Sequence, residues 1–144
     1  MKEMKFEFPI EGGDFINAGQ ASSQIKKILN QLNIDPALVR KISVAIYEAE
    51  VNVVAHAFRG KMKVAINPEK ISVRIEDEGP GIADIEKAME EGYSTASEKV
   101  REMGFGAGMG LSNIKKNTDK LDISSRINLG TVVEMQTLIK PVKG

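Results

Sequence analysis

The segment Glu48-Ala-Glu-Val-Asn52 places a carboxylate and a carboxamide four residues apart inside an apolar stretch. If the stretch is helical, this spacing stacks Glu48 and Asn52 on one face, within reach of each other. Most such pairs lie on a solvated face, but here the surrounding residues are apolar nearly all round. Because buried polar groups need hydrogen-bonding partners, we expect the stripe to line a cavity where a ligand supplies them.

A second segment, Asp77-Glu-Gly-Pro-Gly81, follows a run of alternating apolar and polar residues that predicts a strand. A carboxylate at a strand end can accept a hydrogen bond from an exocyclic amine, and Gly79 and Gly81 would leave room for a flat base. The structural alternative is a plain strand-ending turn, because glycine and proline favour turns in any case.

A run of alternating glycines precedes a predicted helix in the third segment, Gly104-Phe-Gly-Ala-Gly-Met-Gly110. It does not match the P-loop, because no Lys-Ser or Lys-Thr pair follows, or the dinucleotide-binding turn, because no strand precedes it. What remains is a glycine-rich approach to a helix N-terminus, which can bind an anion through free backbone N–H groups. A flexible hinge is the alternative. The glycines are Gly104, Gly106, Gly108 and Gly110.

Two other polar residues, His56 and Glu50, lie in the apolar stretch. His56 is the only histidine, and without a second histidine or any cysteine it makes a poor transition-metal site. A packing or supporting role is therefore favoured over direct chemistry. Glu50 falls on a different helix face from Glu48 and is expected to be structural or exposed.

Composition narrows the class of protein. A chain of 144 residues is most simply one domain spanning 1–144, and 42% hydrophobic residues is ordinary for a globular protein. Twenty basic and twenty acidic residues cancel, which argues against broad binding to nucleic acid or anionic membrane. Cysteine is absent, and no stretch has the length of a membrane span or the apolar block of a signal peptide. We therefore expect a cytoplasmic location and no membrane contact.

Hydrophobic periodicity predicts the elements that position the three segments. Helices are expected over 14–32 (capped by Asp14), 36–58 (capped by Asp35), 84–90 and 109–117. Strands are expected over 4–10, 61–67, 70–77, 121–127 and 131–139. The polar segment 92–103 is weakly patterned, and we expect it to be mobile. This order predicts a two-layer α/β (α+β) sandwich, with a mixed, largely antiparallel sheet and helices on one face.

Taken in order, the three motifs resemble the GHKL ATPase superfamily, which includes gyrase, heat-shock chaperones, mismatch-repair ATPases and sensor histidine kinases. The resemblance runs from the first helix to the hairpin at Gly130-Thr131 and includes Leu111 after the last glycine. Small size and the stretch from Asp77 to Thr95 look most like the stand-alone serine/threonine kinases of bacterial partner-switching modules. Those are the anti-sigma factors and the stress-response switch kinase.

The resemblance implies an ATP site with Mg²⁺. Asn52 would ligate Mg²⁺, which keeps most of its other ligands as water and phosphate oxygens. Asp77 would accept the adenine amino group, with Gly79 and Gly81 beneath the base and Thr131 in a supporting contact. The mobile segment would be the ATP lid, and the phosphates would be wrapped by Gly106, Gly108 and Gly110.

The resemblance also implies a reaction. Glu48 would take the proton from the attacking nucleophile, a water in an ATPase or a serine or threonine hydroxyl of a protein in a kinase. A basic lid residue on the γ-phosphate is expected, and Lys99 and Arg101 both qualify by position. No motif fixes either of them.

Two functions follow as hypotheses. The first is an ATP-dependent serine/threonine kinase that phosphorylates a small antagonist protein, regulates transcription through a sigma factor and forms a homodimer. The alternative is a nucleotide-gated binding module with little or no turnover. A fragment of a sensor histidine kinase is not supported, because no dimerisation helix with a phosphoacceptor is present and His56 lies inside the nucleotide-site helix.

Overall fold

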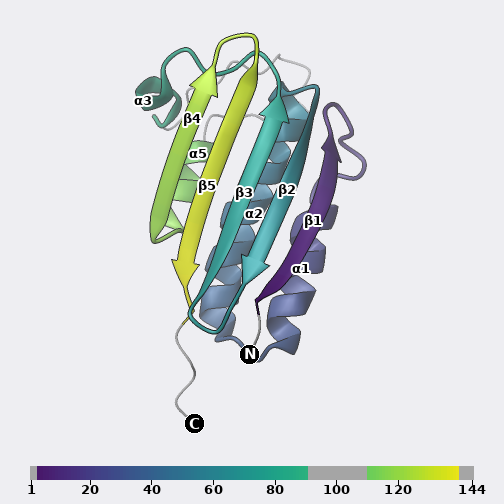
Figure 1. The fold of residues 1–144 in the computed structure, drawn as a ribbon, viewed down its shortest axis with the longest axis vertical. Coiled ribbons are helices and arrows are strands. Elements are labelled where there is room, and N and C mark those ends of the chain that lie inside the picture. The colour runs from purple at the N-terminus through teal and green to yellow at the C-terminus, as the bar shows by residue number, and fades with distance from the viewer. Residues whose placement is uncertain (1–2, 91–109, 140–144) are drawn as a thin grey trace.

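The computed structural model describes residues 3–90 and 110–139, which form an open five-stranded sheet covered on one face by helices (Figure 1). The strand order is β1-β2-β3-β5-β4, and all four pairings are antiparallel. The predicted α+β sandwich is thus confirmed, but the parallel component of the expected mixed sheet is not found among the described strands. The strands are β1 Met4–Glu11, β2 Arg59–Ile66, β3 Lys70–Glu78, β4 Lys120–Arg126 and β5 Gly130–Leu138.

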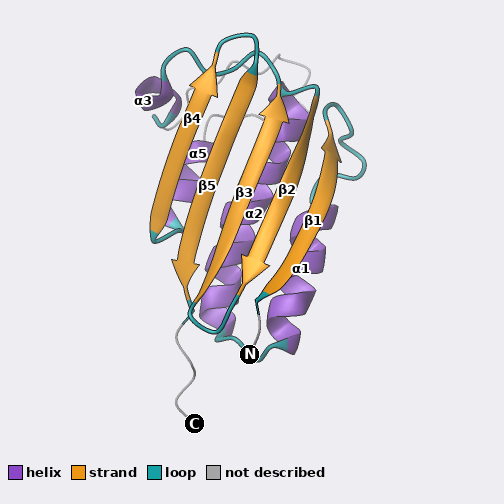
Figure 2. Ribbon diagram, viewed as in Figure 1, coloured by secondary structure: helices purple, strands orange, loops and turns teal. Residues whose placement is uncertain are grey.

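The helices form the second layer (Figure 2). The central one is α2, Pro36–His56, flanked by α1, Gln20–Gln31, and α5, Gly110–Lys116. The short helix α3, Ile85–Ala88, follows β3, the strand that carries Asp77. None of the described helices is both long and apolar enough to cross a membrane.

The core lies between the two layers and follows the sequence periodicities. Alternate residues of the central strands point at the helices, so β2 buries Met62, Val64 and Ile66 while its intervening residues stay more exposed. Helix α2 is buried over most of its circumference, as its composition predicts. It is therefore held rigidly, and any polar side chain on it has a fixed position.

The start of α2 and the β2–β3 turn are explained by local sequence. Asp35 accepts a hydrogen bond from the N–H of Ala37 and Pro36 is the first helical residue, as predicted. At the turn, the Asn67 side chain accepts hydrogen bonds from the N–H groups of Glu69 and Lys70, at 2.8 and 2.9 Å. Such a side-chain turn fixes the register of the hairpin that ends at Asp77.

The start of α1 differs from the prediction. Asp14 does not cap it: its carboxylate binds the backbone and side chain of Asn17 within a local turn, and the helix begins at Gln20. Glu50 of α2 supplies the missing cap. Its carboxylate accepts hydrogen bonds from the N–H groups of Gly19, Ala21 and Ser22 and from the Ser22 hydroxyl, at 2.5–3.3 Å. Glu50 is thus structural, as expected, and buried, with 3% of its surface exposed.

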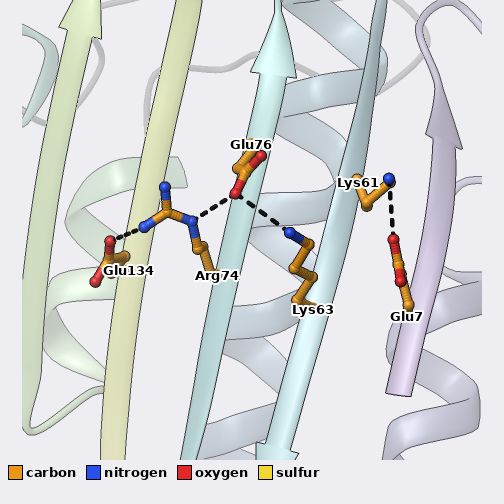
Figure 3. A network of polar contacts seen from close by, with 6 residues as sticks. All are labelled: Glu7, Lys61, Lys63, Arg74, Glu76 and Glu134. Carbon is orange, nitrogen blue, oxygen red and sulfur yellow. Dashed lines mark hydrogen bonds and ion pairs between the residues drawn. The ribbon is translucent and has the colours of Figure 1, made fainter. Parts of the chain in front are cut away.

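None of the described helices covers the outer face of the sheet, which carries charged side chains (Figure 3). Lys61 pairs with Glu7 at 3.0 Å, and Glu76 pairs with both Lys63 and Arg74. Arg74 also binds Glu134 on the neighbouring strand. Each of these charges therefore has an opposite charge beside it.

Candidate functional site

Glu48 and Asn52 lie on the side of α2 that faces α5. A Cβ added to Gly110, the first residue of α5, would lie 3.0 Å from Oδ1 of Asn52. One turn further along α5, the side-chain amide of Asn113 donates a hydrogen bond to Oε1 of Glu48 at 3.3 Å. The two helices therefore run in opposite directions here, with Gly110 against Asn52 and Asn113 against Glu48.

This arrangement brings together two of the three predicted motifs. Gly110 has no side chain, so the backbone at the start of α5 approaches the Asn52 carboxamide closely. Carboxamide and carboxylate oxygens are the hard ligands that Mg²⁺ prefers. The carboxamide oxygen of Asn52 thus fits as one ligand of an ion that takes most of its other ligands from phosphates and water.

Asp77 ends the buried part of β3. Its carboxylate is half-buried, and Oδ1 accepts a hydrogen bond from the N–H of Thr131 at 3.1 Å. Burial raises the pKa of Asp77, and the hydrogen bond from Thr131 opposes the rise. Within the described part of the chain, Oδ2 forms no hydrogen bond. One carboxylate oxygen is thus held by the sheet while the other can accept a donor from a ligand.

Gly79 and Gly81, which follow Asp77, lie so close to other parts of the chain that either position has little room for a side chain. Gly81 has a φ of +77°, and a Cβ there would lie 2.4 Å from the carbonyl oxygen of Arg126. A Cβ on Gly79 would lie 3.0–3.1 Å from Ala57. The space left by the missing side chains is therefore filled by the chain itself, and any support for a base comes from the backbone of this turn.

A serine that sequence reasoning missed joins this turn to the Asp77–Thr131 pair. The hydroxyl of Ser125 lies 2.8 Å from the hydroxyl of Thr131 and accepts a hydrogen bond from the N–H of Ile82 at 2.7 Å. Ser125 stands directly opposite Thr131 in the β4–β5 pairing. Once that hairpin is predicted, its register is the signal that could have found the residue.

Asp77 lies against the last turns of α2, the helix that carries Glu48 and Asn52. A Cβ on Gly60 would contact both Val53 of α2, at 2.9 Å, and the Cβ of Asp77, at 3.3 Å. Gly79 in turn packs on Ala57, the residue that ends the helix. The carboxylate of Asp77 and the polar face of α2 are thus placed at the same end of one helix.

The remaining predicted site residues divide into two groups. Leu111 is 8% exposed and belongs to the hydrophobic core, so its side chain packs α5 against the rest of the protein. His56 is half-buried at the end of α2, and burial lowers its pKa. The other predicted residues lie outside the described part of the chain, as does the segment expected to be mobile. They are Lys99, Arg101, Gly104, Gly106 and Gly108.

Comparison with protein families decides where this fold and site belong. The model of the family described as "Histidine kinase-like ATPase domain" matches residues 15–137 of this chain. The chain belongs to this family. Residues 15–137 include both Glu48 and Asp77, so the ATPase-family match covers every described part of the candidate site.

Two curated relatives of this ATPase-family chain are similar over most of their length. The anti-sigma F factor of Thermoanaerobacter sp. (strain X514) is 31% identical over 135 residues, covering 88% of this chain and 91% of that protein. The serine/threonine-protein kinase RsbT of Bacillus subtilis (strain 168) is 32% identical over 125 residues, covering 84% and 86%. Among solved structures, the SiaB–SiaC complex from Pseudomonas aeruginosa shares the fold, with a TM-score of 0.58, 12% identity and 94% and 89% coverage.

Proposed function

We propose that this ATPase-family chain is a Mg²⁺-ATP-dependent serine/threonine kinase of the anti-sigma type, acting as one unit over 1–144. Its substrate is a small antagonist protein of a partner-switching module. The observation that carries the proposal is the contact between the polar face of α2 and the start of α5, where Gly110 meets Asn52 and Asn113 meets Glu48. The kinase and anti-sigma relatives support it.

Asp77 would bind the adenine amino group through Oδ2. Its other oxygen is already occupied by Thr131, and half-burial strengthens a hydrogen bond by lowering the local dielectric constant. Gly79 and Gly81 would support the base through their backbone. This assigns base recognition to the sheet side of the site.

Asn52 would hold Mg²⁺, and Gly110 with the preceding glycines Gly104, Gly106 and Gly108 would bind the phosphates through backbone N–H groups. Lys99 or Arg101 would neutralise the γ-phosphate. When bound, Mg²⁺ would neutralise the charge on the transferring phosphoryl group.

Glu48 would act as the base. Its carboxylate takes the proton from the serine or threonine hydroxyl of the acceptor protein, while that oxygen forms its bond to the γ-phosphorus and the bond to the departing ADP oxygen breaks. The hydrogen bond from Asn113 to Oε1 would leave Oε2 for the proton. The hydroxyl must therefore arrive from the exposed side of α2.

The nucleotide assignment is tested by Asp77→Asn. If the amide oxygen still accepts from Thr131, the N–H₂ group faces the adenine amine; if the amide is flipped, its oxygen is a weaker, uncharged acceptor for the amine and the N–H of Thr131 loses its acceptor. Losing a hydrogen bond to a charged group should weaken ATP binding about tenfold to a hundredfold, measured by calorimetry with Mg²⁺. Parent-like affinity in the variant would show that the base lies elsewhere.

The transfer step is tested by Glu48→Ala with γ-labelled ATP and fractionated protein from a partner-switching bacterium. We expect ATP binding to be largely retained and label on a serine or threonine to fall at least about a hundredfold. If the parent closes on ATP and binds a partner without transferring label, the nucleotide-gated module replaces the kinase. A cytoplasmic homodimer that also engages a sigma factor completes the proposal.

A further inference from the structure

The exposed charged residues of α1, α2 and α5 are all basic. On α1, α2 and α5 the exposed charged residues are Lys26, Lys27, Arg40, Lys41, Lys115 and Lys116. The only acids on these helices are Glu48, which is half-buried, and Glu50, which is buried in the α1 cap. We call this outward-facing surface of α1, α2 and α5 the helix face. It is basic although the chain as a whole is neutral.

Five of these six basic residues have no ion pair within the described chain. Lys26, Lys27, Arg40, Lys41 and Lys115 form no ion pair with any residue of 3–90 or 110–139. The nearest acids in sequence are used locally: Asp35 caps α2, and Asp119 accepts a hydrogen bond from the N–H of Leu138. The helix face therefore carries positive charge that an external partner can neutralise.

Two exposed apolar side chains lie among the basic groups on α2. Val44 is 37% exposed and Tyr47 is 40% exposed. The ring of Tyr47 is fixed against the start of α1, because a Cβ on Gly19 would lie 3.1 Å from it. Aromatic residues and arginine are enriched where protein partners bind most tightly. An apolar centre with a charged rim is typical of a protein-binding surface.

The surface leads directly to the proposed base. Arg40, Val44 and Glu48 are spaced four residues apart, so they lie along one side of α2 at steps of about 6 Å. Tyr47 stands beside Glu48 on the adjoining side. A protein seated over Val44 and Tyr47 thus needs to extend by only about one helical turn to bring a hydroxyl to Glu48.

We infer that the helix face is the docking surface for the phosphoryl acceptor, a folded protein that presents an acidic surface around an apolar contact. This rests on the proposed kinase function and names the chemistry of its partner. A nucleic acid is the less suitable occupant, because the centre of the surface is apolar and the path to the site ends at a carboxylate that repels phosphate.

The first arm of the test uses fluorescent poly-L-glutamate and measures binding by anisotropy at low salt. The variant Arg40→Glu/Lys41→Glu reverses two charges on the helix face, and Lys5→Glu/Lys120→Glu makes the same change on exposed positions of the outer sheet. We expect the first variant to bind at least about tenfold more weakly and the control to bind like the parent. Failure of the parent to bind, or equal losses in both variants, would overturn the inference.

A single-stranded oligonucleotide is titrated in parallel. If it binds the parent more tightly than poly-L-glutamate and loses affinity in the same variant, the helix face is a nucleic-acid surface and the protein-docking inference is wrong. Calorimetry with ATP and thermal melting establish that both variants keep their fold and their nucleotide site.

The second arm uses the protein that accepts label in the transfer experiment. Arg40→Glu/Lys41→Glu and, separately, Tyr47→Ala should raise the KM for this acceptor about tenfold while kcat and ATP affinity stay near the parent values. Transfer at the parent KM would refute the docking surface and leave the kinase intact. If no protein accepts label although the first arm succeeds, the kinase proposal fails and the acidic-partner surface stands.

Discussion

The two faces of this molecule treat charge in opposite ways. On the outer sheet face, lysine, arginine and glutamate side chains alternate across neighbouring strands and pair with one another (Figure 3). On the helix face, the exposed charges are all basic and the carboxylates are turned inward, Glu50 to the backbone of α1 and Glu48 to Asn113. The sheet face thus pairs most of its central charges internally, whereas the exposed charges of the helix face are of one sign.

The exposed ion pairs of the sheet face and the inward-turned carboxylates of the helices should contribute very differently to stability. Cross-strand ion pairs between exposed side chains contribute little individually, since solvent screens them. A buried carboxylate that caps the start of a helix contributes much more to stability, because removing it leaves buried N–H groups without acceptors. We therefore expect the same substitution to have very different effects on the two faces.

The largest expected effect is that of Glu50→Ala. Three backbone N–H groups and the Ser22 hydroxyl lose their acceptor, which should lower the free energy of unfolding by about 2–4 kcal/mol. The matched control is Glu76→Ala on the sheet face, expected to lower it by less than about 1 kcal/mol. Urea denaturation of both variants gives the comparison. Similar losses would mean that Glu50 is not the anchor of α1.

The next effect concerns the contact between α5 and the proposed base. Asn113→Ala should lower the rate of phosphoryl transfer about three- to tenfold, because Glu48 loses the donor that orients its carboxylate. ATP affinity should stay at the parent value. Lys120→Ala, an exposed change on the outer sheet, is the control, and Asn113→Gln should restore part of the rate. An unchanged rate in Asn113→Ala would show that Glu48 is oriented without this amide.

The sequence was sufficient for most of the architecture. Alternation and helical periodicity predicted all five strands and the four described helices, and Asp35-Pro36 predicted the start of α2 correctly. These features are local, and the fold does not overrule them. The start of α1 was wrong for the opposite reason: its cap comes from Glu50, 28 residues further along the chain from Ser22. No local pattern can predict an acceptor supplied by another helix.

The candidate site shows the same division. Spacing placed Glu48 and Asn52 on one face of α2, and the strand end placed Asp77. Asn113 could not be singled out, because its importance depends on how α5 packs on α2, and Ser125 could be found only through the register of the β4–β5 hairpin. For Gly81 the sequence left a ligand and a plain turn open, and its positive φ and close approach to Arg126 give the turn a structural requirement of its own.

A smaller effect is expected on the sheet face itself. Arg74→Ala removes ion pairs to Glu76 and Glu134 and should lower the stability of the protein only slightly, with the difference from the parent shrinking at high salt. The hydrogen bond from Arg74 lowers the pKa of Glu76, so its contribution is present above the ordinary value of 4.5 and is lost as pH falls through the lowered pKa. Denaturation at neutral and acidic pH measures this. A loss of stability as large as that of Glu50→Ala would mean that the sheet face is a major source of stability.

The smallest expected effect is on the pH dependence of stability, to which His56 and Asp77, both near the end of α2, contribute with opposite sign. Burial lowers the pKa of His56, so the unfolded chain binds a proton that the folded chain refuses, and stability falls as pH drops below the ordinary value of 6.5. Burial raises the pKa of Asp77, so its sign is opposite: stability falls as pH rises from the ordinary value of 3.8 through the raised pKa. Melting curves across this range should show His56→Gln flattening only the loss below pH 6.5 and Asp77→Asn flattening only the fall that follows ionisation of the carboxyl. If His56→Gln leaves the slope below pH 6.5 unchanged, the histidine is as free to ionise as it is in the unfolded chain, and the end of α2 is open to solvent.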